Sequence, residues 1–312
     1  MKLLCSGAAG FIGSHVAEAF IEDGHDVHIV DDLSGGKRSN VPSGATFHHL
    51  DIRSEEATAL VQAERFDMLV HHAAQMNVRE SVKHPREDAS VNVDGLLNLM
   101  EAGRENGLQR VLFASTGGAI YGDPVYAPQD EEHPLCPVSP YGVSKLASEK
   151  YLDFYREEYG IPYVSLRYAN VYGPRQNPAG EAGVIAIFIE QMLNGETPTI
   201  YGDGTQTRDY IYIDDVVAMN RAVMEYEGTR IFNVGTGEET SLNTLFESIQ
   251  KHTDPSIDNT YGPVQPGEQM RSVLDISRAK NELGWSPTTD MDYGIGKTVE
   301  WFAAQLTSSQ SQ

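Results

Sequence analysis

The chain has 312 residues, of which 40% are hydrophobic and 9% aromatic, a composition typical of a globular protein with a large core. Its 45 acidic and 23 basic side chains give a formal net charge of −22, which argues against binding to nucleic acid or an anionic membrane. Because there is no run of 18 apolar residues and no signal-peptide pattern, we expect a cytoplasmic protein.

The first predicted unit is a strand, a glycine-rich turn and a helix. Residues 2–6 are a short apolar run, the turn that follows is GAAGFIG, and residues 14–22 have a helical pattern. In this context Gly7 permits a tight turn, Gly10 lets the backbone approach a pyrophosphate, and Gly13 lets the helix pack on the strand. The alternative is a purely structural turn.

An acidic residue supports the dinucleotide interpretation. The second predicted strand, residues 26–30, ends at Asp31, within the distance from the turn that such sites require. A carboxylate at this place accepts hydrogen bonds from the adenosine ribose and disfavours a 2′-phosphate. The sequence therefore predicts NAD rather than NADP as the cofactor.

Strands and helices continue to alternate through the first half of the chain. We expect strands at 45–50, 68–72, 110–114 and 163–168, and helices at 54–63, 90–106 and 141–159. This order predicts an α/β fold with a doubly wound parallel Rossmann sheet. Ligands of such sheets lie at the carboxyl ends of the strands, where Ala73 and Ala74 leave room for one.

Two pairs of side chains follow that suit proton transfer. Ser115 and Thr116 end the strand that begins at Arg110, and Tyr141 lies four residues before Lys145, on the same helix face. A nearby ammonium is expected to lower the tyrosine pKa from its usual value of about 10 and make the phenol a proton shuttle. Taken alone, the Tyr-Lys spacing also fits an ordinary surface helix.

The segment 121–140, rich in Pro and acidic residues, is predicted to form a wall of the site.

The second half is predicted to form a smaller, mixed α/β C-terminal lobe. Its expected elements are helices at 184–194 and 277–283, a helix after Ser241, and strands at 199–201, 210–213 and 231–234. The helix at 214–225 is expected to return to the first domain, and the polar tail from Ser308 is expected to fray.

Two cysteines and ten histidines show no metal-ligand spacing, so no metal is expected.

Taken together, the motifs resemble those of the extended short-chain dehydrogenases/reductases, and most closely the UDP-glucose 4-epimerases. They are GAAGFIG at 7–13, Asp31, HHAA at 71–74, STGG at 115–118, Tyr141-x-x-x-Lys145, NVYGPRQ at 170–176 and GDGTQTRDYIYIDDV at 202–216. The resemblance implies NAD-dependent epimerisation at C4 of a UDP-hexose, UDP-glucose or UDP-galactose and also their N-acetyl forms, through a 4-keto sugar. It divides the chain into a Rossmann domain, residues 1–168 with a return segment at about 209–225, and a nucleotide-sugar-binding lobe, residues 169–208 and 226–312.

The resemblance also assigns roles to individual residues. The implied catalytic residues are Tyr141, Lys145, Thr116 and Ser115. The implied cofactor-binding residues are Gly7, Gly10, Phe11, Ile12, Gly13, Asp31, Asp32, Leu33, Ser34, Asp51, Ile52, His72, Ala73, Ala74, Asn92, Tyr141, Lys145 and Tyr168. The implied substrate-binding residues are Thr116, Asn170, Val184, Thr199, Tyr201, Arg208 and Arg271.

Two positions depart from the family pattern. Gln265 stands where relatives carry a second phosphate-binding arginine, which leaves Arg271 as the candidate replacement. Ser272 is small where some relatives carry a bulky residue that closes the sugar pocket, so N-acetylhexosamines are expected as substrates.

Other functions on the same fold stay open to different degrees. An epimerase or decarboxylase acting on UDP-glucuronate is not distinguished by these motifs. A 4,6-dehydratase is disfavoured, because Gly117-Gly118 replaces its acidic pair, and a non-catalytic NAD-binding regulator is disfavoured because Tyr141 and Lys145 are both present.

In relatives, the helices expected at 90–106 and 145–159 pair with a second subunit, so a homodimer is expected.

Overall fold

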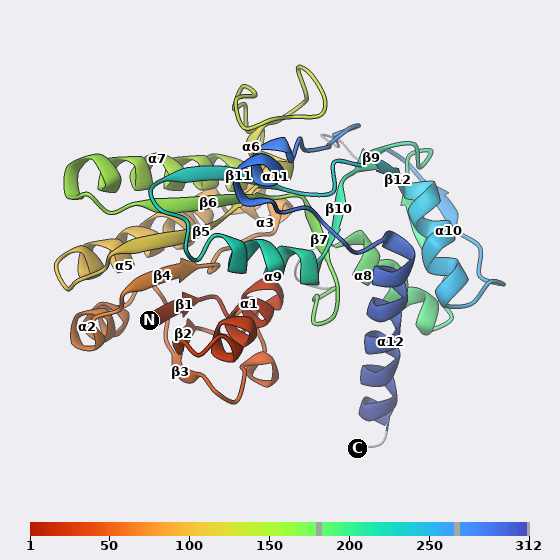
Figure 1. Cartoon of the computed structure of the whole chain (residues 1–312). Coiled ribbons are helices and arrows are strands. Elements are labelled where there is room, and N and C mark those ends of the chain that lie inside the picture. The colour runs from red at the N-terminus through yellow and green to blue at the C-terminus, as the bar shows by residue number, and fades with distance from the viewer. Residues whose placement is uncertain (179–182, 265–268, 311–312) are drawn as a thin grey trace.

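A computed structural model describes residues 1–178, 183–264 and 269–310, and its centre is a parallel seven-stranded sheet (Figure 1). The strand order is β11-β6-β5-β4-β1-β2-β3, and every neighbouring pair runs parallel. The strands are β1 (Lys2–Ser6), β2 (Asp26–Asp31), β3 (Thr46–His49), β4 (Met68–His71), β5 (Arg110–Thr116), β6 (Tyr163–Tyr168) and β11 (Arg230–Val234). The predicted fold class, a doubly wound parallel sheet, is confirmed.

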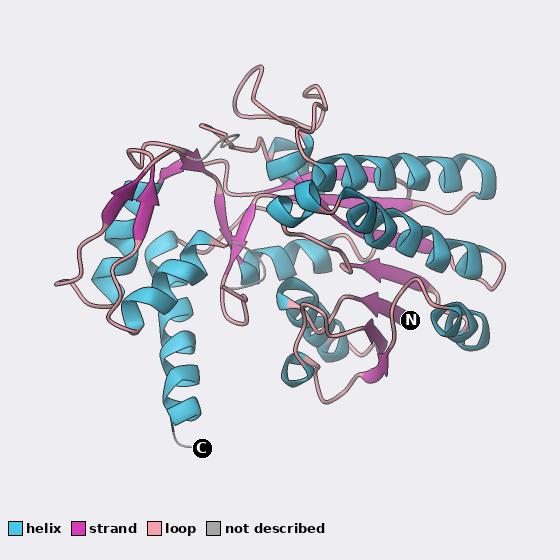
Figure 2. Cartoon of the chain, turned by 180° about the vertical axis from the view of Figure 1, so that it is seen from behind, coloured by secondary structure: helices cyan, strands magenta, loops and turns pink. Residues whose placement is uncertain are grey.

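Helices cover both faces of the sheet, as the unbroken apolar character of its inner strands requires (Figures 1 and 2). One hydrophobic core contains Val61, Leu99 and Leu152 and lies beneath α2, α5 and α7. The opposite core lies beneath α1 and α9. The helices of this domain are α1 (Phe11–Glu22), α2 (Glu55–Glu64), α3 (Val78–Lys83), α4 (Pro85–Ala89), α5 (Gly95–Arg104), α6 (Gly117–Ile120), α7 (Pro140–Tyr159), α9 (Ile213–Ala222) and α11 (Ser277–Leu283), with a 3₁₀ turn at Arg38–Asn40.

A smaller lobe projects from the carboxyl ends of the strands, where three helices and three short strand pairs form a second layer (Figure 2). Its helices are α8 (Val184–Leu193), α10 (Leu242–His252) and α12 (Met291–Gln310). Its strand pairs are β7 (Asn170–Tyr172) with β10 (Tyr210–Tyr212), β8 (Thr199–Tyr201) with β13 (Thr260–Gly262), and β9 (Thr207–Arg208) with β12 (Thr240–Ser241). Within the described ranges, no helix is both long and apolar enough to cross a bilayer.

Four predictions about the elements are wrong. The strand at 231–234 and the helix at 277–283 were expected in the small lobe, but β11 pairs with β6 and extends the central sheet, and α11 packs on β11. The long helix expected at 90–106 has a π-helical turn at Ser90–Asp94 before α5 begins. The tail expected to fray from Ser308 continues α12 as far as Gln310; residues 311–312 lie outside the described part of the chain. The other predicted domain boundaries stay a prediction.

A buried ion pair ties α7 to the sheet. The side chains of Glu149 on α7 and Arg167 on β6 are 0% and 2% exposed, and Arg167 Nη2 lies 2.7 Å from Glu149 Oε2. Arg167 Nε and the Ser165 hydroxyl both donate to Glu149 Oε1, while Arg167 Nη1 donates to the Tyr121 hydroxyl at 3.0 Å. Because a buried charge is tolerated only with a full set of partners, this cluster fixes α7 relative to β6.

We predict that Arg167→Met lowers the free energy of unfolding by about 3 to 5 kcal/mol, because it leaves the Glu149 carboxylate buried and unpaired. The matched control is Arg156→Met, which removes the exposed ion pair with Glu157 on the same helix and is expected to cost less than about 1 kcal/mol. Urea denaturation measures both. Equal losses in the two variants would show that the buried pair does not stabilise the fold.

Candidate active site

The glycine-rich turn forms the floor of a cavity of 430 Å³ at the carboxyl ends of β1, β2 and β4. Gly7 has a φ of +71°, and a Cβ atom added there would lie 2.4 Å from the backbone nitrogen of Ala73. A Cβ at Gly13 would lie 2.6 Å from the Gly7 carbonyl oxygen, so no larger residue fits where α1 packs on the turn. The N-terminus of α1, capped by Gly10 alone, leaves its amides available to an anion.

Asp31 at the end of β2 is held in place by two backbone amides. Its carboxylate accepts hydrogen bonds from the nitrogens of Ala9 at 2.9 Å and Leu33 at 2.8 Å. Asp31 is only 7% exposed, and this burial raises the pKa of its carboxyl group. Each carboxylate oxygen keeps further acceptor capacity, which suits the paired hydroxyls of a ribose.

These observations fit NAD. The turn is too close to Ala73 for any side chain, the helix N-terminus favours a pyrophosphate, and the acidic strand end favours a ribose without a 2′-phosphate. The predicted cofactor residues that line this cavity are Gly7, Gly10, Asp31, Asp32, Ser34, Asp51, Ile52, His72, Ala73 and Ala74. Arg53, which the sequence did not single out, joins them and donates to Asp51 through Nε and Nη2.

A second cavity, of 640 Å³, brings together the predicted proton-transfer residues. Ser115, Thr116 and Tyr141 all lie in its wall, together with the predicted cofactor residues Phe11, Ile12 and Tyr168. The Thr116 hydroxyl caps α6 by accepting from Ala119 N at 3.2 Å and also hydrogen-bonds with the Tyr141 side chain. The Ser115 hydroxyl is buried and has no hydrogen-bond partner within the described ranges, so it is available to a ligand.

Lys145 lies behind this wall. The side chain is 3% exposed, its Nζ donates to the Ala114 carbonyl oxygen at 2.9 Å and it lies 4.8 Å from the centre of the Phe113 ring. Burial lowers the pKa of Lys145 to about 8, although the carboxylates of Asp88 and Glu149 oppose this shift.

The prediction that Lys145 lowers the pKa of Tyr141 is wrong for the protein alone. Burial of Tyr141, reinforced by the negative charge of Asp88, raises the pKa of the phenol above its ordinary value, and only the hydrogen bond with Thr116 opposes this. Loss of water stabilises the neutral phenol relative to the phenolate. The sequence spacing identified the pair correctly but gave no information about its desolvation.

Predicted substrate residues line the part of the larger cavity that faces the small lobe. They are Asn170, Val184, Thr199, Tyr201 and Arg208. The neighbouring Asp209 fixes the backbone here, because its buried carboxylate accepts from Thr236 N at 2.7 Å, Gly237 N at 3.1 Å and Leu274 N at 3.3 Å. Arg208 is therefore carried by a segment that two separate parts of the chain, residues 236–237 and Leu274, hold in place.

The two departures from the family pattern have different outcomes. The guanidinium of Arg271 binds Glu239 through two hydrogen bonds of 2.9 and 2.7 Å, on the exposed surface and away from the cavity wall, so the expectation that it replaces the missing arginine is not met. Ser272 is buried, 3% exposed. Gln265 lies outside the described residues.

Several residues of the larger cavity escaped the sequence analysis. They are Met76, Arg79, Gln176, Phe188, Gln191 and Leu242. The Oε1 atoms of Gln176 and Gln191 are buried without a hydrogen-bond partner in the described part of the chain, so each can accept a hydrogen bond from a ligand. Gln191 could have been found, because it is a polar residue on the same face of the apolar helix α8 as Val184.

Asn92 has a different position from the one expected. It is 2% exposed in the π-helical turn, accepts from Gln75 N at 2.8 Å, and donates to Gln75 O at 3.0 Å and the Ser144 hydroxyl at 3.0 Å. It therefore lies behind the cofactor cavity and holds the segment after β4 against α7. Wide turns of this kind often occur at functional sites because they redirect a side chain.

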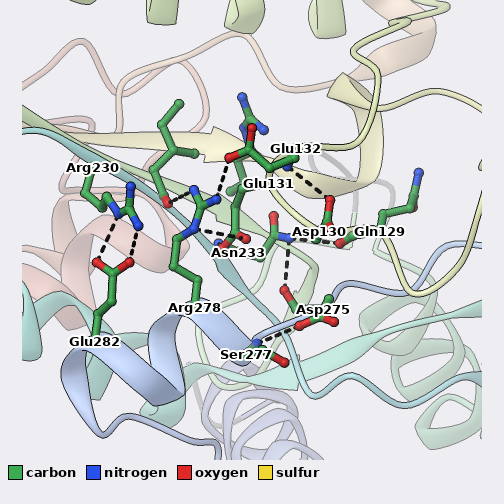
Figure 3. Close-up of polar contacts among 12 residues, drawn as sticks. Gln129, Asp130, Glu131, Glu132, Arg230, Asn233, Asp275, Ser277, Arg278 and Glu282 are labelled. Carbon is green, nitrogen blue, oxygen red and sulfur yellow. Dashed lines mark hydrogen bonds and ion pairs between the residues drawn. The ribbon is translucent and has the colours of Figure 1, made fainter.

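The segment predicted as a site wall, 121–140, does not line either cavity: the described residues that do so come from other parts of the chain. Its last residue, Pro140, begins α7, and the loop itself is 121–139. It extends beyond the sheet and docks on β11 and α11 (Figures 1 and 3). Arg278 contacts Glu131 at 3.5 Å and Glu132 at 2.6 Å, and the Asn233 amide donates to the carbonyl oxygen of Gln129 at 2.9 Å. Acidic residues of this segment pair with Arg278 on α11. The sequence alone did not predict that this helix lies beside the segment.

Comparisons with known proteins agree with this geometry. The chain is 44% identical to a UDP-glucose 4-epimerase of Mycolicibacterium smegmatis over 308 residues, covering 97% of this chain and 98% of the relative. Its fold matches a crystal structure of UDP-glucose 4-epimerase with UDP-glucose from Thermotoga maritima with a TM-score of 0.95, 45% identity, and coverage of 98% and 100% of the two chains.

A third comparison concerns the cofactor. The crystal structure of a Thermus thermophilus UDP-glucose 4-epimerase complex with NAD matches with a TM-score of 0.90 and 41% identity, covering 97% of this chain and 99% of the other. The family model for the NAD-dependent epimerase/dehydratase family matches residues 3–235. The chain therefore belongs to the NAD-dependent epimerase/dehydratase family.

Proposed function

We propose that the protein is a NAD-dependent 4-epimerase that interconverts UDP-glucose and UDP-galactose. The observation that carries this proposal is the single cavity in which Thr116 and Tyr141 share a wall with Asn170 and Arg208. Proton-transfer groups and groups suited to a sugar diphosphate thus face one ligand. Similarity over nearly the full length to epimerases solved with UDP-glucose and with NAD supports the same substrate and cofactor.

In this mechanism Tyr141 takes the proton of the sugar 4-hydroxyl and later returns it to the 4-oxygen, while hydride returns to the opposite face of C4. The Thr116 hydroxyl, which already hydrogen-bonds with Tyr141, orients the phenol, and Ser115 supplies a second donor to the sugar oxygen. The chemistry that NAD supplies when bound is reversible hydride transfer at C4. Lys145 contributes a positive charge that favours the phenolate at the moment of transfer.

The remaining residues hold the nucleotide while the sugar turns. The Arg208 guanidinium suits the diphosphate oxygens, Asn170 can donate to the same group, and the backbone at Thr199–Tyr201 is placed to bind the base. If the contacts are concentrated on the UDP moiety, the hexose of a 4-keto intermediate can present either face to the hydride donor. A cavity of 640 Å³ leaves room for that rotation.

A uronic acid substrate is the second candidate. Arg79 adds a guanidinium to the cavity wall that holds Tyr141, and a carboxylate on the sugar would suit such a group. Incubation with UDP-glucuronate and NMR analysis of the products distinguishes the two. A uronate decarboxylase would give a UDP-pentose and carbon dioxide, a uronate 4-epimerase would give the C4 epimer of UDP-glucuronate, and an enzyme confined to UDP-hexoses would leave UDP-glucuronate unchanged.

We also propose a homodimer and a cytoplasmic location. The outer face of α7 exposes Val143, Tyr151 and Phe154 at 53%, 42% and 48%, an apolar stripe suited to a helix pair from a second copy. Light scattering measures the mass in solution, and a monomer at all concentrations would contradict the dimer.

Tyr141→Phe is expected to reduce kcat for UDP-galactose by about 10²-fold to 10⁴-fold, the usual contribution of an acid-base group, because the ring stays and the proton carrier is lost. Tyr151→Phe, an exposed change on the same helix, should keep full activity. A coupled assay for UDP-glucose measures both variants, and wild-type turnover by the Tyr141 variant would refute the mechanism.

The small Ser272 side chain leads to a prediction about substrate range. The family resemblance implies that position 272 lies beside the sugar, although Ser272 is not among the described residues that line the cavity. UDP-N-acetylglucosamine is expected to turn over at a rate comparable to UDP-glucose, and Ser272→Tyr is expected to lose the N-acetylated substrate selectively, because a larger ring at that position would narrow the sugar pocket. Ser272→Ala is the matched control and should accept both. Equal loss of both substrates in the Tyr variant would indicate misfolding rather than exclusion.

A further inference from the structure

Asp88 is a buried carboxylate beneath the proton-transfer pair. It lies on α4, is 1% exposed, and its helix packs against α7, which carries Tyr141 and Lys145. Neither the motifs nor the cavity walls assign it a role. Burial of an ionised carboxylate at this depth costs free energy of folding. Its presence here therefore points to a function for the charge.

The hydrogen-bond donors to Asp88 are neutral amides, and they contact only one of its two carboxylate oxygens. Oδ1 accepts from Gln75 Nε2 at 3.1 Å and Asn92 Nδ2 at 3.2 Å, whereas Oδ2 is buried with no hydrogen-bond partner in the part of the chain that the structure describes. The Ser144 hydroxyl donates to the Tyr141 carbonyl oxygen at 3.0 Å and accepts from Asn92 Nδ2 at 3.0 Å, the same amide nitrogen that donates to Asp88. Asp88 is thus linked to the backbone of α7 through Asn92 and Ser144.

The charges around the pair come from several elements. Glu149 on α7 is paired with Arg167 but still opposes the lowering of the Lys145 pKa, and burial together with the charge of Lys145 lowers the pKa values of His71 and His72 at the end of β4, which keeps them uncharged. Among the described residues, Asp88 is the carboxylate that acts on both members of the pair. Burial raises the pKa of the Asp88 carboxyl group, and the charge of Lys145 opposes that rise. Asp88 in turn adds to the rise that burial causes in the pKa of Tyr141 and opposes the fall that burial causes in the pKa of Lys145.

We propose that Asp88 is a positioning residue whose negative charge offsets that of Lys145, so that Tyr141 can both release and regain a proton. This inference rests on the proposed epimerase function. A shuttle that works in both directions needs a phenolate that is accessible but not too stable. Lys145 and an oxidised nicotinamide both stabilise the phenolate, and Asp88 supplies the opposing charge.

The test is Asp88→Asn in the NAD-bound enzyme, with kcat/KM for UDP-galactose measured against pH. Asn keeps an oxygen acceptor for Gln75 and Asn92 but removes the charge. Loss of a negative charge favours the phenolate of Tyr141 and the neutral amine of Lys145, so both pKa values fall. The ascending and descending limbs should therefore move together to lower pH by about one unit, while KM stays unchanged.

Asp94→Asn is the matched control, because Asp94 is an exposed carboxylate in the adjacent π-helical turn. The Asp94 variant should have the same pH profile as the wild type. Epimerase activity in the wild type and in this variant tests the proposed function separately from the role of Asp88. Unmoved limbs in the Asp88 variant, or a raised KM with unmoved limbs, would overturn the proposal. An Asp88 variant that does not fold, judged by circular dichroism, would also overturn it, since the hydrogen-bond acceptor is retained.

Discussion

Desolvation of Tyr141 and Lys145 is the constraint on which the rest of the site depends. Removing water favours the neutral form of both side chains, so the phenol holds its proton more tightly and the amine holds its proton less tightly than in solution. The ordinary pKa values of tyrosine and lysine are therefore too low for Tyr141 and too high for Lys145. The nearby polar groups, the Thr116 hydroxyl and the Asp88 carboxylate, act within this low-dielectric environment, where each has a larger effect than it would in water.

The scaffold delivers these groups to one place because its strands are parallel. The carboxyl ends of β1, β2 and β4 form the cofactor cavity, and the end of β5 places Ser115 and Thr116 beside α7. The Glu149–Arg167 pair then fixes α7 to β6 and, through Tyr121, to Asn233 on β11. Asn233 in turn lies beside the segment that docks on α11 (Figure 3). A single chain of buried contacts thus connects α7 to the far edge of the sheet.

Local patterns in the sequence were sufficient to predict the alternating elements, the glycine-rich turn, Asp31 and the Tyr141 to Lys145 spacing, because each depends on near neighbours in the chain. The wrong predictions depended on distant partners. The pairing of β11 with β6, the docking of residues 121–139 and the ion pair of Arg271 with Glu239 are contacts that no local pattern encodes. The direction of the Tyr141 pKa shift also depends on burial, which only the folded chain defines.

In the proposed reaction the same hydride leaves and returns to C4 of the sugar, and Tyr141 moves only the proton. NMR analysis of UDP-galactose labelled with deuterium at C4 tests it most directly. The account predicts UDP-glucose that retains the deuterium at C4, because the same hydride leaves and returns. Loss of the deuterium to water, or a product other than the C4 epimer, would contradict it.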